Sequence, residues 1–292
     1  MFKSGFVSMI GKANVGKSTL LNSLLNQKVS IASDKPNTTK HKILGIYNDP
    51  NSQIIFVDNP GLIYQRKKIL ISKVNFVTLK NIEDVKVILF LVNDECRTED
   101  KEILTFFQKY NKNIILVITK IDLFTKKTSI DKIILSYLKH FTFDAVIPLS
   151  SIKKQNLNIL KENILSLLDK RPPYFSKSFT TNLSKEELIL EFIREKIFYY
   201  SDKELPHVCS VVLDNIINNE DFSIQMDILI SVPKISQRKI LIGSNGTKLK
   251  KIRLAAQKDI RRFLKKKISL NLWVKVDPKM KNKGKFLFDV IS

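Results

Sequence analysis

The chain has 292 residues, which is long for one compact core and favours two domains. A hydrophobic content of 43% with 27% charged residues is typical of a globular protein and excludes a disordered or fibrous chain. The net charge of +22 is concentrated, since residues 231–292 hold 18 Lys and Arg against three Asp. Such a concentration predicts a polyanionic partner, either nucleic acid or an acidic membrane surface. A codon bias toward lysine is the alternative and explains part of the excess, but it would spread the charge more evenly along the chain.

Neither cysteine usage nor apolar runs point to an extracellular or membrane-spanning protein. Cys96 and Cys209 are far apart and have no Cys or His at ligand spacing, so we expect no disulfide framework and no zinc site. The longest apolar run, Val87–Val92, is far too short to cross a bilayer. A strand is predicted almost at the N-terminus, which leaves no room for a signal or transit peptide and favours the cytoplasm.

A phosphate-binding loop is the strongest motif. Residues 11–18 fit the pattern G-x-x-x-x-G-K-[ST], between an apolar strand over Gly5–Ile10 and a helix starting with Thr19–Leu25. Glycines let backbone N–H groups converge on a phosphate, and the helix N-terminus adds partial positive charge. Lys17 would reach the β- and γ-phosphates, and the Ser18 hydroxyl would ligate Mg²⁺. The loop residues are Gly11, Lys12, Ala13, Asn14, Val15, Gly16, Lys17 and Ser18, followed by Thr19.

A second motif follows the apolar strand predicted over Gln53–Asp58. Asp58 ends this strand and precedes Asn59, Pro60 and Gly61. An acid at the end of a strand can reach Mg²⁺ through water, and the Gly61 N–H can donate to a γ-phosphate. Taken alone this pattern is a common turn, but its place behind a phosphate loop favours the functional interpretation.

The rest of the first half alternates apolar strands with amphipathic helices. Strands are predicted over Val85–Val92 and Ile114–Ile118, with a helix over Lys101–Tyr110 between them and a further apolar run from Ala145. This alternation predicts a parallel sheet with helices on both faces and ligand-binding loops at the strand ends. Two such loops hold Thr119, Lys120, Ile121 and Asp122, and Ser150 and Ser151.

Taken in order, these motifs resemble the signatures of Ras-like translational GTPases. The resemblance implies that Asp122 accepts two hydrogen bonds from guanine, that Lys120 lies along the base, and that the Ser150–Ser151 backbone meets the guanine oxygen. It also implies GTP and GDP as ligands. The chain departs from the pattern at Thr119, where Asn is usual, and at Lys154, where glycine is common. Thr119 keeps a hydroxyl but loses the amide, so base choice should survive with weaker affinity.

The resemblance also implies a Mg²⁺ site and a catalytic strategy. Ser18 and Asp58 would bind the metal, and Thr38 or Thr39, with Thr39 favoured, would complete the shell when GTP is bound. The catalytic residues implied are Lys17, Thr39, Gly61 and Asn14. Leu62 stands where Ras has a water-positioning glutamine, and a leucine cannot hydrogen-bond water. Relatives with this apolar residue often use K⁺, held partly by the asparagine that corresponds to Asn14.

The second half predicts a different kind of domain. Residues 171–174 read Arg-Pro-Pro-Tyr and end the last helix of the first domain, and residues 171–182 are predicted as a linker. Ser184 and Glu187 match a capping box that opens a helix through Tyr199. Strands are predicted over Val208–Ile216 and Phe222–Val232. A last strand has Ile268, Leu270, Leu272, Val274 and Val276 on one face, and for Trp273 packing is favoured over stacking on a base.

A G-x-x-G turn, Gly243–Gly246, lies between two predicted helices of this half. In K-homology modules this turn clamps the backbone of single-stranded RNA, because its glycines allow close approach to phosphate. A helix-joining turn is the commoner cause of the pattern, but the surrounding cations favour RNA binding. The predicted RNA-binding residues are Arg238, Lys239, Gly243, Ser244, Asn245, Gly246, Lys248, Lys250, Lys251 and Arg253.

With both halves considered, the chain resembles the Era family of bacterial ribosome-assembly GTPases over nearly its whole length. The most specific segments are Lys35–Thr39, Glu191–Lys196, Glu204–Pro206, Gly243–Gly246 and Leu272–Val276. The chain departs from the family at Asn59, where Thr is usual, at Thr119, and in the tail over residues 277–292, which lacks a tryptophan-containing segment common in relatives.

The resemblance implies an α/β fold, in which a Ras-like P-loop GTPase domain with a mostly parallel sheet is followed by an α+β K-homology domain. The domain boundaries we expect are 1–170 for the GTPase domain, 171–182 for the linker and 183–292 for the RNA-binding domain. The implied partners are small-subunit ribosomal RNA near its 3′ end and the pre-30S particle. A monomer is expected, cytoplasmic and partly associated with the inner face of the cell membrane.

Three functions compete at this point. The leading hypothesis is a slow GTPase switch that binds and matures ribosomal RNA, with GTP ordering the switch loops and hydrolysis releasing them. A second is an RNA-binding assembly protein whose nucleotide site is vestigial. A third is a membrane-surface GTPase whose basic C-terminal face meets anionic lipid.

Overall fold

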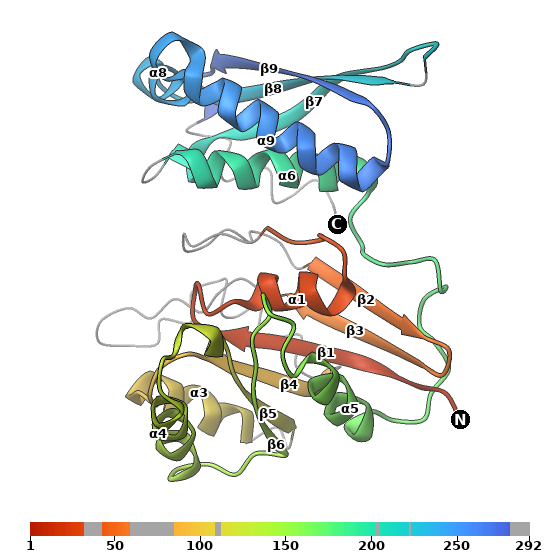
Figure 1. Cartoon of the computed structure of the whole chain (residues 1–292), viewed down its shortest axis with the longest axis vertical. Coiled ribbons are helices and arrows are strands. Elements are labelled where there is room, and N and C mark those ends of the chain that lie inside the picture. Colours follow the sequence, from red (N-terminus) through yellow and green to blue (C-terminus); the bar gives the residue numbers. More distant parts are fainter. Residues whose placement is uncertain (32–42, 59–84, 109–111, 202–204, 222, 281–292) are drawn as a thin grey trace. The chain divides into compact units, whose positions relative to one another are not determined.

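The computed structural model describes residues 1–31, 43–58, 85–108, 112–201, 205–221 and 223–280 (Figure 1). The chain divides into two compact units, with the division between Leu183 and Ser184. Each unit is described by itself below.

The first unit is built on a six-stranded sheet in the order β2-β3-β1-β4-β5-β6. All neighbouring pairs are parallel except β2 with β3, so the predicted mostly parallel sheet is confirmed. The strands are β1 (Lys3–Gly11), β2 (Ile43–Asp49), β3 (Ser52–Asp58), β4 (Val85–Val92), β5 (Asn113–Ile118) and β6 (Ala145–Pro148).

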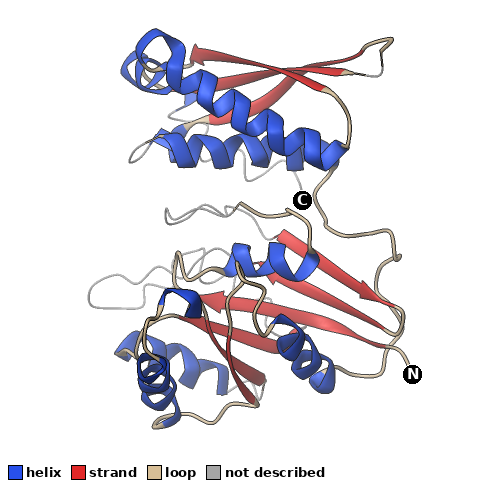
Figure 2. Ribbon diagram, in the orientation of Figure 1, coloured by secondary structure: helices blue, strands red, loops and turns tan. Residues whose placement is uncertain are grey.

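Helices cover both faces of this sheet (Figure 2). They are α1 (Lys17–Leu25), α3 (Thr98–Gln108), α4 (Lys127–Leu138) and α5 (Leu157–Leu167). On β4, Ile88 and Phe90 join a core cluster with α3 and α4, whereas the alternate residue Leu89 is buried toward the other face, where α5 packs. The predicted helix over 101–110 in fact begins at Thr98, because acidic residues in the first turn favour the helix N-terminus there. Tyr110 lies outside the described residues.

Strand β2 was not predicted, and its sequence explains why. Gly45 interrupts the apolar alternation. A glycine is needed there for packing against α1 and not for a turn. A Cβ atom there would lie 2.5 Å from Leu21 Cδ1 of α1, so the missing side chain lets the helix lie against the strand.

The segment predicted as a linker is bound along the first unit. The side chain of Gln53, which is fully buried, donates to Phe175 O at 2.8 Å and accepts from the backbone N–H of Tyr174 at 2.8 Å. Further along, the N–H of Ile46 on β2 donates to Thr180 O at 2.9 Å. Residues 171–182 are therefore held in place by β2 and β3, and the two units separate only after Leu183.

The second unit has the element order of an α+β fold. Its elements are α6 (Lys185–Tyr200), α7 (Leu205–Val208), β7 (Ser210–Asn218), β8 (Ile224–Val232), α8 (Ile235–Ile242), α9 (Thr247–Leu264) and β9 (Ile268–Val276). The sheet order is β7-β8-β9, with β7 antiparallel and β9 parallel to β8, so β9 is an edge strand. Helices α6 and α9 lie side by side over one face of the sheet (Figures 1 and 2).

Several predictions for this unit are confirmed. Ser184 caps α6 through a capping box, in which its hydroxyl accepts from the Glu187 N–H at 3.1 Å and its own N–H donates to the Glu187 carboxylate at 2.7 Å. The alternating residues of β9 are buried or half-buried on one face, as predicted.

No helix in the described ranges is both long enough and apolar enough to cross a membrane.

The segment Glu191–Lys196, which carried part of the family resemblance, serves the packing of α6 against α9. Glu191 pairs with Arg194 along α6. Lys196 Nζ lies 2.7 Å from the Asp259 carboxylate of α9 and 3.0 Å from that of Glu195. These side chains are mostly buried, and the Lys196–Asp259 pair links the two helices.

Candidate nucleotide site and candidate RNA groove

The motifs of the first half meet at one edge of the sheet. The parallel strands β1, β3, β5 and β6 run in the same direction, so their carboxyl ends share that edge. Gly11 and Asp58 end β1 and β3, Thr119 follows β5, and Ser150 follows β6 by two residues. The sequence-predicted nucleotide residues in the described ranges are thus brought together.

The phosphate loop has a shape that a side chain at Gly11 or Gly16 would disturb. A Cβ atom on Gly11 would lie 2.4 Å from Leu91 O, and Gly16 has a φ of 107°. Asn14, which is exposed, also has a positive φ of 64°. Helix α1 starts directly after this loop, and no described side chain caps its N-terminus. The partial positive charge of this helix N-terminus favours an anion at the loop.

Lys17 lies over the loop that precedes it. Its Nζ donates to Gly11 O at 3.0 Å and to Lys12 O at 2.8 Å, and the residue is only 7% exposed. Burial lowers the pKa of Lys17 to about 8, and the nearby Asp58 carboxylate opposes this. A bound phosphate would add anionic oxygens next to this buried ammonium and favour its charged form.

Asp58 is held by two hydroxyl groups. Ser18 Oγ and Ser30 Oγ donate to its Oδ2 at 2.9 and 2.8 Å. Burial raises the pKa of Asp58, while Lys17 and the two hydroxyls act in the opposite direction. Its other oxygen, Oδ1, is buried and has no hydrogen-bond partner among the described residues.

This arrangement fits a hydrated Mg²⁺ ion. A hydroxyl and a carboxylate with one oxygen left unpartnered are the hard oxygen donors that Mg²⁺ prefers, and the ion usually keeps several of its waters. Ser30 was missed by sequence reasoning. No local pattern marks it, because its contact with Asp58 crosses from the loop after α1 to the end of β3.

Thr119 joins the fourth motif to the phosphate loop. Its Oγ1 lies 2.6 Å from Val15 O and 3.1 Å from Val92 O, and the residue is 2% exposed. The stem of Lys120 passes over Gly16, with Cε 3.9 Å from the position that a Cβ atom would take there. A hydroxyl is therefore enough to tie the two loops together in this chain.

Asp122 and Ser150 connect the fourth motif to the fifth. Ser150 Oγ donates to Asp122 Oδ1 at 2.5 Å and accepts from the Lys153 N–H at 3.1 Å. Ser23 Oγ of α1 donates to Ser151 O at 3.0 Å, which anchors the same loop to the helix. The Asp122 carboxylate, which is partly exposed, is thereby oriented for a ligand with paired N–H donors.

The departure at Lys154 has a structural meaning. Lys154 has a φ of 54°, in the left-handed region that glycine adopts without strain. Its Nζ donates to Asn26 Oδ1 at 2.7 Å, so the side chain links the loop to the end of α1.

Lys12 makes a contact that the motif did not predict. Its Nζ pairs with the Asp100 carboxylate of α3 at 3.0 Å, and Asp100 is 1% exposed. The same carboxylate accepts from Tyr137 OH of α4 at 3.1 Å. The Lys12 side chain is thus directed to the helices, and only its backbone is placed to meet a phosphate.

The remaining predicted residues of the site are placed as follows. Ala13 lies half-buried in the phosphate loop, and Thr19 in the first turn of α1. Ile121 lies in a 3₁₀ turn, Ile121–Leu123, where its N–H donates to Leu149 O at 3.3 Å. Thr38, Thr39, Asn59, Pro60, Gly61 and Leu62 lie outside the described residues.

The G-x-x-G turn lies between two helices, as predicted. Gly243 follows α8 with φ 74° and ψ 176°, and Gly246 precedes α9 with φ 72° and ψ 8°. A Cβ atom on Gly243 would lie 2.7 Å from Lys248 Cβ, whereas one on Gly246 would meet nothing within 4 Å. Ser244 O accepts from the Thr247 hydroxyl at 2.8 Å, and Asn245 has a φ of 48°.

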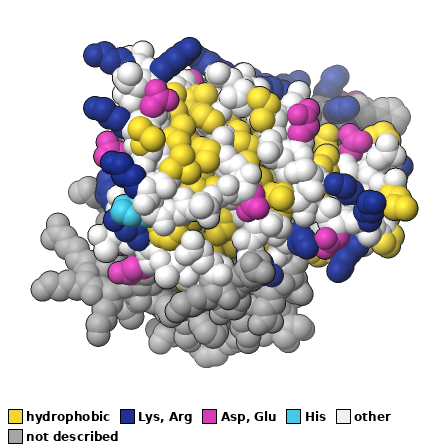
Figure 3. All heavy atoms as spheres, turned by 90° about the horizontal axis from the view of Figure 1, so that it is seen from below, with side chains coloured by type: hydrophobic (Ala, Val, Ile, Leu, Met, Phe, Trp, Pro, Cys, Tyr) yellow, Lys and Arg dark blue, Asp and Glu magenta, His cyan; other side chains and the backbone are white. Residues whose placement is uncertain are grey.

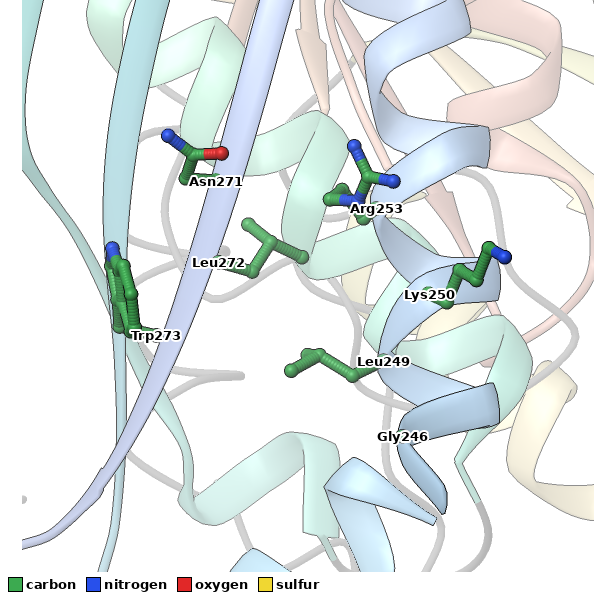
Figure 4. A pocket seen from close by; sticks show the side chains of 7 residues that line it. All are labelled: Gly246, Leu249, Lys250, Arg253, Asn271, Leu272 and Trp273. Atoms are coloured by element: carbon green, nitrogen blue, oxygen red, sulfur yellow. The ribbon is translucent and has the colours of Figure 1, made fainter. Parts of the chain in front are cut away.

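A groove of about 250 Å³ begins at this turn and runs between α9 and β9 (Figure 4). It is lined by Gly246, Leu249, Lys250, Arg253, Asn271, Leu272 and Trp273. Of the other predicted cations, Arg238, Lys239 and Lys251 are exposed on α8 and α9, and Lys248 is half-buried. None of these cations forms an ion pair with an acidic residue in the part of the chain that the structure describes.

Two further surface features concern the charge and Trp273. In Figure 3, which shows one face of the molecule, Asp and Glu side chains are scattered among the Lys and Arg side chains that surround a more apolar centre. That mixture contrasts with α8 and α9, where Asp259 is the one acidic residue among the cations. Trp273 is 61% exposed, so the expectation that it packs in the core is wrong. The alternation of β9 places it on the face opposite Leu272.

Family models and curated relatives match this architecture. Residues 6–120 match a family described as 50S ribosome-binding GTPase, and residues 204–281 match the KH domain family. GTPase Era from Geotalea daltonii is 39% identical over 277 residues, covering 94% of this chain and 93% of the relative. GTPase Era from Clostridioides difficile is 36% identical over 97% of this chain and 96% of the relative.

The chain belongs to the Era family of GTPases. Two solved Era structures have the same fold over nearly the whole chain. One is Era in complex with MgGDPNP and nucleotides 1506–1542 of 16S ribosomal RNA, with a TM-score of 0.87, 33% identity and 99% coverage of this chain and 98% of that one. The other is a variant of Aquifex aeolicus Era bound to GDP·AlF₄⁻, with a TM-score of 0.87, 34% identity and 98% coverage of both.

We expect the base preference of this Era-family chain to reside in Asp122. Asp122→Asn replaces one acceptor oxygen by a donor, which suits xanthine better than guanine, while the remaining amide oxygen can still accept from Ser150. GTP affinity should fall at least about tenfold and affinity for xanthosine triphosphate should rise. Titration with the two fluorescent nucleotides measures both, and unchanged GTP affinity would contradict the assignment.

We expect the Thr119 hydroxyl to support nucleotide affinity without choosing the base. Thr119→Val keeps the shape but leaves Val15 O unpaired, so GTP and GDP affinities should both fall about 2- to 10-fold. Thr119→Ser, which keeps the hydroxyl, is the matched control and should stay near wild type. A valine variant that is folded by circular dichroism and binds both nucleotides normally would rule out the tether.

Proposed function

We propose that this chain is a GTP-hydrolysing switch that binds small-subunit ribosomal RNA near its 3′ end and acts in assembly of the small subunit. In this proposal residues 1–170 form the GTPase domain and residues 183–292 the RNA-binding domain. The observation that carries it is the combination, in one chain, of the Lys17–Ser18–Asp58 cluster with the groove at Gly243–Gly246. The related Era structure that contains MgGDPNP and 16S ribosomal RNA supports both halves.

Each residue of the nucleotide site has a role in this proposal. The N–H groups of residues 13–18 and the N-terminus of α1 bind the phosphates, and Lys17 places its ammonium on the β- and γ-phosphates. Ser18 and Asp58 would hold a Mg²⁺ ion, which would neutralise charge on the β- and γ-phosphates. Asp122, oriented by Ser150, selects guanine, and Lys120 lies along the base.

Hydrolysis in this proposal depends on positioning rather than on a side-chain base. Leu62 cannot orient water, so the catalytic contributions come from backbone donors, Lys17 and a cation near the phosphates. Asn14 is exposed in the phosphate loop with a positive φ. In this proposal its amide oxygen is a ligand of the monovalent cation. Thr39 and Gly61 would complete the site from the two switch segments.

The identity of the RNA rests on the full-length relatives. The family model that matches residues 6–120 is described as 50S ribosome-binding, whereas the Era structure holds 16S RNA. The Era structure covers 99% of this chain and includes the KH groove, so we give it the greater weight. In the groove, Gly246 admits the backbone of a single strand, and Lys250 and Arg253 lie beside it as phosphate partners.

The competing functions are weaker on specific grounds. A vestigial nucleotide site would not need to retain the costly burial of Lys17 and Asp58. A membrane-surface role would use the cations but would have no use for the glycine turn or for the groove between α9 and β9. We propose a cytoplasmic location, with association to the inner face of the membrane as a secondary possibility. Steady-state GTP turnover and RNA binding by the purified full chain test the proposal together.

Hydrolysis should depend on K⁺ over Na⁺ because of Asn14 and Leu62. We expect several-fold faster GTP turnover in KCl than in NaCl at equal ionic strength. Asn14→Asp should alter this ratio, while Lys17→Ala should remove turnover in both salts. Phosphate release measured in the two salts is the test, and equal rates with a neutral Asn14→Asp variant would exclude a monovalent-cation mechanism.

RNA binding should require an unobstructed Gly246. Because a Cβ atom there meets nothing within 4 Å, Gly246→Asp should fold while its carboxylate repels phosphate. We expect a loss of at least about tenfold in affinity for an RNA of nucleotides 1506–1542, with GTP binding retained.

Gly246→Asn is the matched control, since asparagine is nearly the same size as aspartate and tolerates the same positive φ but has no charge. It should lose clearly less affinity than the aspartate variant. Gly243→Asp, by contrast, meets Lys248 Cβ at 2.7 Å and should disturb the fold itself. A folded Gly246→Asp protein that binds this RNA normally would refute the K-homology role.

A further inference from the structure

Trp273 is a large apolar side chain in an unusual place. It lies on β9, the edge strand of the second unit, and is 61% exposed. Fully burying such a ring would be favourable, so an exposed tryptophan on a regular strand is typical of a binding surface. The function proposed above does not use this ring, although the residue lines the groove that begins at Gly246.

The ring stands at the end of an apolar row across the open face of the sheet. Trp273 is in register with Leu229 of β8, which is in register with Val212 of β7. Helices α6 and α9 cover the opposite face, where Leu272 points toward Leu249 (Figure 4). Val212 is 44% exposed, so this row remains open to solvent in the described unit.

Polar groups beside the ring suit a nucleotide. Lys275 is exposed two residues further along β9 and therefore on the same face as Trp273. Asn271, two residues before Trp273, donates from Nδ2 to Asp227 Oδ1 at 2.8 Å. This hydrogen bond engages one of the two oxygens of the Asp227 carboxylate. An aromatic ring with a lysine on the same strand face suits the stacking of a base and the pairing of its phosphate.

We propose that Trp273 stacks an unpaired RNA base on the open face of the KH sheet, just beyond the edge strand β9. The strand held at Gly246, Lys250 and Arg253 crosses this edge, and Lys275 receives the next phosphate. Continuity supports RNA as the occupant, because Trp273 lines the same groove as those two cations. The inference rests on the proposed RNA-binding function and adds to it a base-binding position outside the cleft between α9 and β9.

The single tryptophan of the chain makes a direct experiment possible. Tryptophan emission of the full-length protein is titrated with the RNA of nucleotides 1506–1542, and stacking should quench it. The titration is repeated with RNAs that carry one abasic nucleotide at successive positions. We expect one abasic position to remove most of the quenching and to weaken binding.

Substitution provides the energetic test. Trp273→Ala should weaken RNA binding about 5- to 100-fold, and Trp273→Phe should lose much less, because every aromatic face can stack a base. The abasic RNA that abolishes quenching should bind the Trp273→Ala protein no more weakly than intact RNA does. Tyr199→Ala, which removes another exposed aromatic ring of this unit from α6, is the control and should bind RNA normally.

The outcomes separate this inference from the proposed function. RNA binding that is sensitive to Gly246→Asp but indifferent to Trp273→Ala would overturn the inference and leave the function standing. The inference would also be overturned if RNA quenched the wild-type emission while Trp273→Ala bound RNA with unchanged affinity, since the ring would then only report binding. A Trp273→Ala defect in binding an assembly protein, with RNA binding intact, would assign the row to a protein. No RNA binding by the wild-type chain would refute both proposals.

Discussion

Two buried charges of opposite sign, Lys17 and Asp58, set the constraint on which the nucleotide site depends. Both are withdrawn from water, which is costly for each charged form and explains the opposite directions of their pKa shifts. The protein compensates only in part, through two carbonyl oxygens on Lys17 and two hydroxyls on Asp58. The remaining compensation must come from a ligand that carries anionic oxygens and a cation together, as a Mg²⁺-bound phosphate does. The same cluster therefore explains both the local folding of the loop and its function.

Local signals in the sequence predicted those parts of the molecule that local interactions determine. The phosphate loop, the capping box at Ser184 and the turn at Gly243 are each specified within a few residues, and each was located correctly. Contacts between distant segments were not predictable. Ser30 meets Asp58 across 28 positions, and Gln53 holds a segment more than 120 positions away. Strand β2 was missed because Gly45, which allows α1 to approach the strand, interrupts the apolar alternation that predicts a strand.

Residues of one motif can have different physical roles, which the sequence alone does not distinguish. The two glycines of the G-x-x-G turn both have positive φ, yet one lacks room for a side chain and the other faces open space. The fold therefore needs Gly243 for both its φ and its lack of a side chain, whereas at Gly246 only the φ favours glycine and the space beside it is open to a ligand. Lys12 shows the converse, since a residue inside a phosphate motif directs its charge to Asp100 and stabilises the scaffold. Assigning roles within a motif requires these individual contacts.

The charge of the second unit has a consequence for how RNA is distinguished. Asp259, the only acid between residues 231 and 276, is paired with Lys196, so it does little to offset the cations along α9. Such a field attracts any polyanion and falls steeply with salt, which provides affinity without sequence preference. If the unit binds RNA as proposed, preference must come from neutral features of short range. The candidates are the turn at Gly246, the apolar side chains of Leu249 and Leu272, and the ring of Trp273. In the proposed function, long-range charge would bring RNA to the unit, and the groove would decide which single strand remains bound.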